Sequence, residues 1–202
     1  MIELESKKRM ESLKQSIETA TGESYENLTG AFKAMKEVVD KYKFFYKNLR
    51  TISFVENRKM TEVPVIDCVN FKSLASTFYA CTGLKVVTLR NTQNITNFKD
   101  FIYNTYIETI GILDFSGVTN ASGVADAFRG NSSITNIEFV PETIHFSVSI
   151  GSTKLTAESV QSIAGGLAFV TTAQTLTISK NVPVTEEQKA TISNKGWTLV
   201  QK

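Results

Sequence analysis

The single histidine, His145, is the residue that would most readily support catalysis or metal binding in this chain of 202 residues. It lies in the segment ETIHFSVS, which is typical of an exposed or half-buried strand. A metal site needs further His, Cys or carboxylate ligands at short spacing, and the sequence around His145 supplies no such set. A nucleophile that used His145 as its base would be expected in a pattern such as GxSxG, which the sequence lacks. We therefore predict no metal ion and no nucleophilic triad.

The two cysteines, Cys68 and Cys81, lie thirteen residues apart and are not part of a CxxC pair. This spacing indicates neither a zinc site nor a disulfide framework. A small buried apolar side chain is the commoner role for such a cysteine. We predict that Cys81 is a buried free thiol in the turn before Leu84, and that it is not bonded to Cys68.

Other kinds of catalysis have no clearer support. Glycoside hydrolysis requires two facing carboxylates, and although the chain has twenty acidic residues, no pair of them stands out. Gly165 and Gly166 lie inside a helical pattern and lack the Lys-Ser/Thr that follows a phosphate-binding loop. The sequence therefore predicts no catalytic residue, no cofactor site and no enzymatic activity.

The distribution of charge bears on the partners. Residues 1–50 hold ten Lys/Arg and eight Asp/Glu, and residues 51–202 hold twelve of each. A protein that binds nucleic acid carries a basic surplus that neutralises phosphates, so nucleic acid is not expected as a partner. The segment MIELESKKRMESLKQ has charged residues where a signal peptide needs an apolar run, and no stretch is long and apolar enough for membrane insertion. We expect a chain that is made in the cytoplasm and does not use the secretory route.

Residues 1–45 are expected to form a helical hairpin that serves as an attachment or oligomerisation segment. Apolar residues recur at steps of three and four on either side of the turn TGES. The residues assigned to this apolar surface are Met10, Leu13, Ile17, Phe32, Met35 and Val39. So short a hairpin cannot bury both apolar stripes in itself. It is expected to dock on the rest of the chain, on a second copy or on another protein, and the sequence leaves these alternatives open.

From residue 49 the apolar period changes, and three segments align with one another. They are FYACTGLKVVTL, FIYNTYIETIGI and FRGNSSITNIEF, which begin at Phe78, Phe101 and Phe128. Each aromatic residue is followed by aliphatic residues six and nine positions later. The intervals of 23 and 27 residues between the aromatic residues fall in the range of leucine-rich repeats.

The aliphatic pairs predict short strands whose inward side chains stack on those of the next coil, which places Ile110 beside Ile137 on adjacent strands. The segment LRTISF, residues 49–54, has the same strand pattern one coil earlier, with Leu49, Ile52 and Phe54 facing inward. For residues 46–202 these features predict an α/β repeat fold, a short leucine-rich-repeat-like solenoid. We expect the N-terminal helical hairpin before it and a C-terminal helix-strand cap at its end.

The C-terminal cap is predicted from two consecutive helix-strand units. LTAESVQSIAGGLAFV indicates a helix with Thr156 at its N-cap and Glu158 in its first turn, followed by the strand-like QTLTIS. TEEQKATISNKGWTLV repeats this order, with Thr185 before a helix, Gly196 at its end and WTLV as a last short strand. A solenoid needs such a unit to cover its last apolar rung.

STFYACTGLKVVTL and VTNASGVADAFRGNSSITNIEF resemble the BspA-like leucine-rich repeats of bacterial surface and phage proteins. The shared features are a V-T-N segment, a Phe-centred turn and a small-residue step into a short strand, over roughly residues 49–140. SLKQSIETATGESYENLTGAFKAM resembles the N-terminal segment of tail-associated proteins of phages that infect Gram-positive bacteria, and the two C-terminal units resemble their C-terminal repeat. The resemblance implies a virion component that is assembled in the bacterial cytoplasm.

We therefore expect a non-enzymatic structural or binding component of a phage tail or a related contractile particle, such as a baseplate, fibre or receptor-engaging protein. Its partners would be other virion or tail proteins, or a second copy, bound through residues 1–45, and a host surface receptor is a further candidate. The strand residues expected to face away from the core, where repeat proteins bind partners, are Val86, Thr88, Arg90, Thr109, Asn136 and Glu138. The alternative is a bacterial cell-surface or extracellular adhesion module with leucine-rich repeats.

Overall fold

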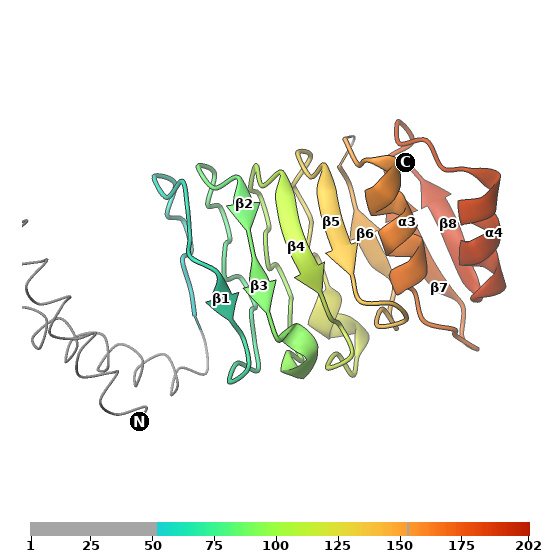
Figure 1. The fold of residues 1–202 in the computed structure, drawn as a ribbon, viewed down its shortest axis with the longest axis horizontal. Helices are drawn as coiled ribbons and strands as arrows, with labels where there is room; N and C mark the ends of the chain where they lie inside the picture. The colour runs from blue at the N-terminus through green and yellow to red at the C-terminus, as the bar shows by residue number, and fades with distance from the viewer. Residues whose placement is uncertain (1–51, 153) are drawn as a thin grey trace, which may run out of the picture. The chain divides into compact units, whose positions relative to one another are not determined.

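Short parallel strands and two C-terminal helices make up the part of the chain that the computed structural model describes, residues 52–152 and 154–202 (Figure 1). These residues belong to one unit, Leu49–Lys202. The elements, in chain order, are β1 (Ile66–Asp67), β2 (Val86–Val87), β3 (Leu89–Arg90), the 3-10 helix η1 (Thr92–Asn94), β4 (Thr109–Leu113), the 3-10 helix η2 (Ala121–Val124), β5 (Asn136–Phe139), β6 (Val148–Ile150), α3 (Ala157–Gly166), β7 (Gln174–Ile178), α4 (Glu186–Asn194) and β8 (Trp197–Gln201).

The strands are divided among three separate parallel sheets. One contains β1 and β3, the second contains β2, β4 and β5, and the third contains β6, β7 and β8. The predicted α/β repeat fold, a leucine-rich-repeat-like solenoid, is therefore wrong, because its strands would form one continuous ladder from coil to coil. The described residues also contain only two α-helices, both near the C-terminal end. The predicted N-terminal hairpin, residues 1–45, and its boundary with the rest of the chain lie outside the described residues.

The second sheet ends at β5 because helix α3 takes the place of the next strand. The hydroxyl of Ser159 accepts a hydrogen bond from the backbone N–H of Ile137 at 3.0 Å, and that of Ser162 accepts one from Phe139 at 2.9 Å. Ser159 also donates to the carbonyl of Thr135 at 3.0 Å. These side chains satisfy the backbone of β5 that a further strand would otherwise bind, so the ladder stops there.

Within the second sheet, the predicted neighbours do lie side by side. Ile110 on β4 is in register with Val87 on β2 and with Ile137 on β5. All three side chains are buried. The prediction that Ile110 and Ile137 are buried on adjacent strands is therefore confirmed.

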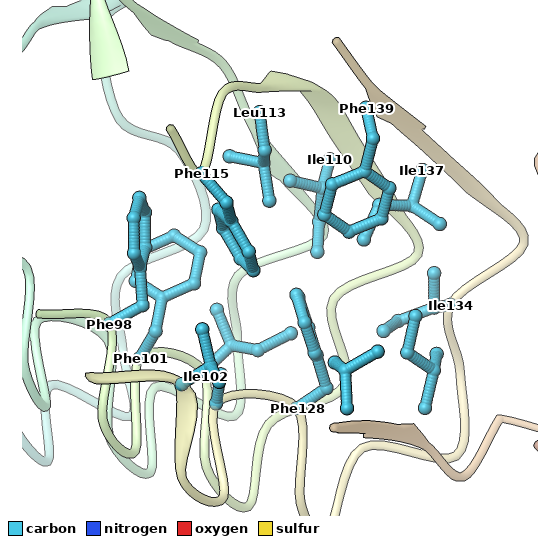
Figure 2. Close-up of a cluster of buried hydrophobic side chains, with 14 of the residues drawn as sticks. Phe98, Phe101, Ile102, Ile110, Leu113, Phe115, Phe128, Ile134, Ile137 and Phe139 are labelled. Atoms are coloured by element: carbon cyan, nitrogen blue, oxygen red, sulfur yellow. The ribbon is translucent and has the colours of Figure 1, made fainter. Parts of the chain in front are cut away.

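The aromatic residues that begin the three aligned segments face these strands from the other side of the core. Figure 2 shows Phe128 extending toward Ile110 and Ile137, and Phe101 lying beside Phe98. Phe78 is buried as well, and its ring lies 5.6 Å from that of Phe101, in an edge-to-face arrangement. Edge-to-face and offset rings at such distances add to the apolar burial that stabilises the core.

Phe54 continues the column of aromatic rings formed by Phe78 and Phe101, which we call the aromatic column, and does not belong to a strand. Its ring stacks on Phe78 at 5.5 Å, and its backbone N–H donates to the carbonyl of Thr77. The prediction of a strand over residues 49–54 is thus wrong for its described residues, which include no strand. The first strand of the described residues is β1, which pairs with β3.

The aromatic column is carried by successive turns that stack through backbone hydrogen bonds. We call these segments, residues 54–56, 74–80, 97–104 and 123–130, the turn ladder. Alternate N–H groups of each segment donate to carbonyls of the next, as in Phe78 to Phe101 and Ile102 to Ala127, both at 3.0 Å. Left-handed backbone conformations recur at Ser76, Asp100 and Asp126 and again four residues later in each segment.

The two C-terminal helices begin where the sequence predicts. The side chain of Thr156 accepts a hydrogen bond from the N–H of Ser159 and caps α3. Thr185 and Gln188 form a reciprocal capping box at the start of α4. Gly196 adopts a φ of 84°, a left-handed conformation that favours glycine, just after α4. Strands β7 and β8 follow these helices as expected.

Candidate protein-binding surface

The exposed side of the second sheet carries three of the residues predicted to bind a partner. Val86 on β2 is in register with Thr109 on β4, which is in register with Asn136 on β5. Side chains alternate between the two faces of a strand, so these residues face outward because their neighbours Val87, Ile110 and Ile137 face the core. Val86 is 51% exposed. The structure therefore brings Val86, Thr109 and Asn136 together in one row.

The other three predicted strand residues occupy different places. Thr88 is partly exposed between β2 and β3. Glu138 is exposed on β5, two residues after Asn136 and on the same face of the strand. Arg90 is exposed on β3, which pairs with β1, so it lies in a different sheet from the row formed by Val86, Thr109 and Asn136.

The sequence pattern did not predict two further exposed apolar residues, Ile112 and Tyr106. Ile112 is 49% exposed although the alternation starting at Ile110 also makes position 112 inward-facing. A register shift explains this, because Ile110 pairs with Ile137 whereas Leu113 pairs with Phe139, so two residues of β4 lie opposite one residue of β5. Tyr106, 52% exposed, precedes β4 and carries no periodic signal.

A charged pair borders the row. The ammonium of Lys85 lies 2.8 Å from a carboxylate oxygen of Glu108, and both side chains are about half exposed. The hydrogen bond from Lys85, and then its positive charge, lower the pKa of the Glu108 carboxyl. An exposed pair of this kind contributes little to stability, but it gives the border a defined charge pattern. We call Val86, Thr109, Asn136, Ile112 and the pair Lys85–Glu108 the outward strand face.

The six predicted binding residues of the N-terminal segment lie outside the described residues. They are Met10, Leu13, Ile17, Phe32, Met35 and Val39.

The residues considered for chemistry are dispersed. His145 is exposed and lies outside the strands. Cys68 and Cys81 are buried free thiols, as predicted for Cys81. Burial raises the pKa of Cys81, and it raises the pKa of Cys68 to about 12. Within residues 52–152 and 154–202, no three His, Cys, Asp or Glu side chains are grouped so that they could hold a metal ion.

Two open hollows mark the surface of the C-terminal half. The larger, of about 580 Å³, lies beside α3, and Phe139, Pro141 and Ala157 are among its lining residues. The smaller, of about 310 Å³, lies between the last segment of the turn ladder and strands β6 and β7. In the described part of the chain, no helix has the length and apolar character needed to cross a membrane.

The chain matches no protein-family model, no curated protein and no solved structure. Evidence for a binding site therefore comes from the surfaces of the described residues. Of these, the outward strand face combines exposed apolar side chains, hydrogen-bonding groups and an ion pair on a backbone held by a parallel ladder.

Proposed function

We propose that this chain is a non-enzymatic structural or binding component of a phage tail or a related contractile particle, and that the outward strand face contacts its partner. The register of Val86, Thr109 and Asn136 is the observation that supports the binding role. Parallel strands lie at a fixed spacing of about 4.8 Å, so these side chains form an ordered surface that need not rearrange on binding.

The composition of the face favours a protein partner. Val86 and Ile112 leave apolar surface exposed, and Lys85 and Glu108 provide charge of both signs beside it. Apolar side chains at the centre with charged groups at the edge are typical of protein interfaces. A face that binds nucleic acid would instead carry a surplus of basic residues.

The assignment to a tail particle depends on resemblance. The segments SLKQSIETATGESYENLTGAFKAM and TEEQKATISNKGWTLV resemble parts of tail-associated phage proteins. The partners would then be other virion or tail proteins, or a receptor on the host surface. The site of action would be the virion, which is assembled in the bacterial cytoplasm.

Co-sedimentation with purified particles tests the proposal. The full-length chain, tagged, is expressed in a bacterial culture that produces the particles, alongside a face variant with Val86→Arg and Asn136→Arg. A matched control carries Glu187→Arg and Ser193→Arg, at exposed positions of α4. We expect the wild-type chain and the control to sediment with the particles, and the face variant to remain in the supernatant while its urea unfolding curve is unchanged.

Two results would contradict the proposal. Normal incorporation of the face variant would show that the outward strand face is not the contact surface. Recovery of the wild-type chain in the cell-envelope fraction, and not in particles, would favour an adhesion module of the bacterial surface.

A further inference from the structure

The last helix-strand unit, residues 185–202, contains α4 and β8 and buries little apolar surface. Its buried side chains are Ile192 and Trp197, which are apolar, and Gln188 and Lys195, which are polar. Segments with few buried apolar contacts open more readily than the rest of a protein. Polar groups must therefore supply much of what holds the last unit in place.

Gln188 and Lys195 hold α4 against both ends of α3. Near the start of α3, the side-chain amide of Gln188 donates to the carbonyl of Ala157 at 3.3 Å. At the other end, the ammonium of Lys195 donates to the carbonyls of Gly165 and Leu167, at 2.8 and 2.7 Å. The last carbonyls of a helix lack partners within the helix and attract positive charge. The Lys195 ammonium supplies both the hydrogen bonds and the charge.

The contacts of Lys195 are shielded from water. Its side chain is 10% exposed, and a carboxylate oxygen of Glu142 lies 4.0 Å from its ammonium. Hydrogen bonds from a charged donor are stronger than those between neutral groups. Close to it in the sequence, the indole N–H of Trp197 donates to the carbonyl of Ala168 at 2.8 Å. Lys195 and Trp197 thus bind the backbone of residues 165–168 together.

The last unit lies at an edge of the structure. Strand β8 is the edge strand of the third sheet, and among the described residues it pairs with β7 alone. Residues 179–184, which join β7 to α4, form neither a helix nor a strand. A loop of this kind can absorb the backbone rotation that moves a neighbouring element. The last unit can therefore separate without breaking the first two sheets.

We propose that the last unit opens as one body while the rest of the described residues stays folded, and that the Lys195 ammonium keeps it closed. Opening breaks the ladder between β7 and β8, exposes Trp197 and frees the backbone edge of β7. The last unit shares no residue with the outward strand face, so this proposal stands or falls independently of the proposed function.

Two natural probes separate the last unit from the rest of the chain. Trp197 is the only tryptophan, so tryptophan fluorescence reports on the last unit. Cys68 and Cys81 are the only cysteines, and both are buried, so their reaction with a thiol reagent reports on the part of the structure before β2. In a urea series on the full-length protein, we expect the fluorescence to change at a lower urea concentration than the one at which the thiols react.

Variants test the role of Lys195. Lys195→Met removes the charge and keeps most of the side-chain length. We expect it to lower the urea midpoint of the fluorescence change by roughly 1 M or more, and to leave the thiol midpoint within about 0.2 M. Gln188→Ala, which removes the contact with Ala157, should also lower the fluorescence midpoint alone. Lys189→Met is the control, because Lys189 lies on the same helix in an exposed pair with Glu186, and it should shift neither midpoint.

The proposal is overturned if the thiols of the wild-type protein react at the same urea concentration as the fluorescence change, or at a lower one, because the last unit would then not open first. It is also overturned if Lys195→Met lowers both midpoints together, or if its thiols react without urea, since Lys195 would then support the whole fold. An unchanged fluorescence midpoint in Lys195→Met would mean that the ammonium does not keep the unit closed.

Discussion

At the scale of single residues, the ionisation of the Cys68 thiol is coupled to folding. Burial is the main cause that raises its pKa to about 12, and the charge of the neighbouring Asp67 adds to the effect. The folded protein therefore keeps this thiol protonated at pH values where the unfolded chain ionises it. The resulting stability is fully present below the ordinary thiol pKa, and it is lost as the pH rises from there toward 12.

We expect this coupling to appear in the comparison with Cys68→Ala. The difference in unfolding free energy between the wild-type protein and the variant should shrink between about pH 8 and about pH 11, because only the wild type has the thiol to ionise on unfolding. Urea unfolding at both pH values measures it. Val87→Ala, at a fully buried position without a titratable group, is the control and should show a constant difference. A constant difference for Cys68→Ala would mean that the thiol is less buried in solution.

The residues Ile110 and Ile137 allow a second prediction at this scale. Both are buried and in register on β4 and β5. Changing either one to Ala should lower the unfolding free energy by about 2–5 kcal/mol, through lost burial and the cavity that remains. Because the side chains are neighbours, the loss of unfolding free energy in the double variant should differ from the sum of the two single losses. Chemical denaturation of the four proteins measures this, and a cost near zero would be incompatible with a shared core.

At the scale of elements, the end of the second sheet depends on two hydroxyl groups. Ser159 and Ser162 of α3 accept the hydrogen bonds that β5 would otherwise give to another strand. Changing either serine to Ala leaves a backbone N–H without its partner and should lower the unfolding free energy by about 1–3 kcal/mol. Thermal unfolding measures the loss. Ser193→Ala, at an exposed position of α4, is the control and should be nearly neutral, within about 0.5 kcal/mol.

The opposite outcome would also be informative. If Ser159→Ala and Ser162→Ala are as neutral as Ser193→Ala, water replaces the hydroxyls at the edge of β5. The packing of α3 on β5 alone would then be what ends the sheet.

The sequence predicts some of these elements and not others. The helices that start after Thr156 and Thr185 were predictable, because a capping residue and an apolar stripe are local signals. The end of the sheet was not, because Ser159 and Ser162 look like ordinary polar residues of an amphipathic helix. The structure around Phe54 was not predictable either. Phe54 fits a strand pattern in the sequence, but its ring stacks on Phe78 in the turn ladder.

The candidate surface divides in the same way. Val86, Thr109 and Asn136 were predictable from alternation along each strand and from the equal offsets of the aligned segments. Ile112 was not, because the register shift in β4 changes the face on which it lies.

At the scale of the whole molecule, the described residues carry their own core. Buried apolar side chains form one cluster that includes residues from Ile66 to Trp197 and unites all three sheets. Its first partly buried members, Ile52 and Phe54, already pack against that cluster. A core of this extent is expected to fold without help from residues 1–45.

The last prediction concerns those residues. Residues 1–45 carry the apolar stripes that include Met10 and Leu13 on one side of the turn TGES, and Phe32 and Met35 on the other. If this segment is the attachment or oligomerisation device, deleting it should leave a folded, soluble protein that no longer self-associates or enters the particle, because an exposed apolar stripe marks an interface. Light scattering and thermal unfolding of the full-length and shortened chains measure both properties. A full-length chain that is strictly monomeric, together with a shortened chain that unfolds, would instead mean that the segment covers the core of its own chain, and the attachment hypothesis would be wrong.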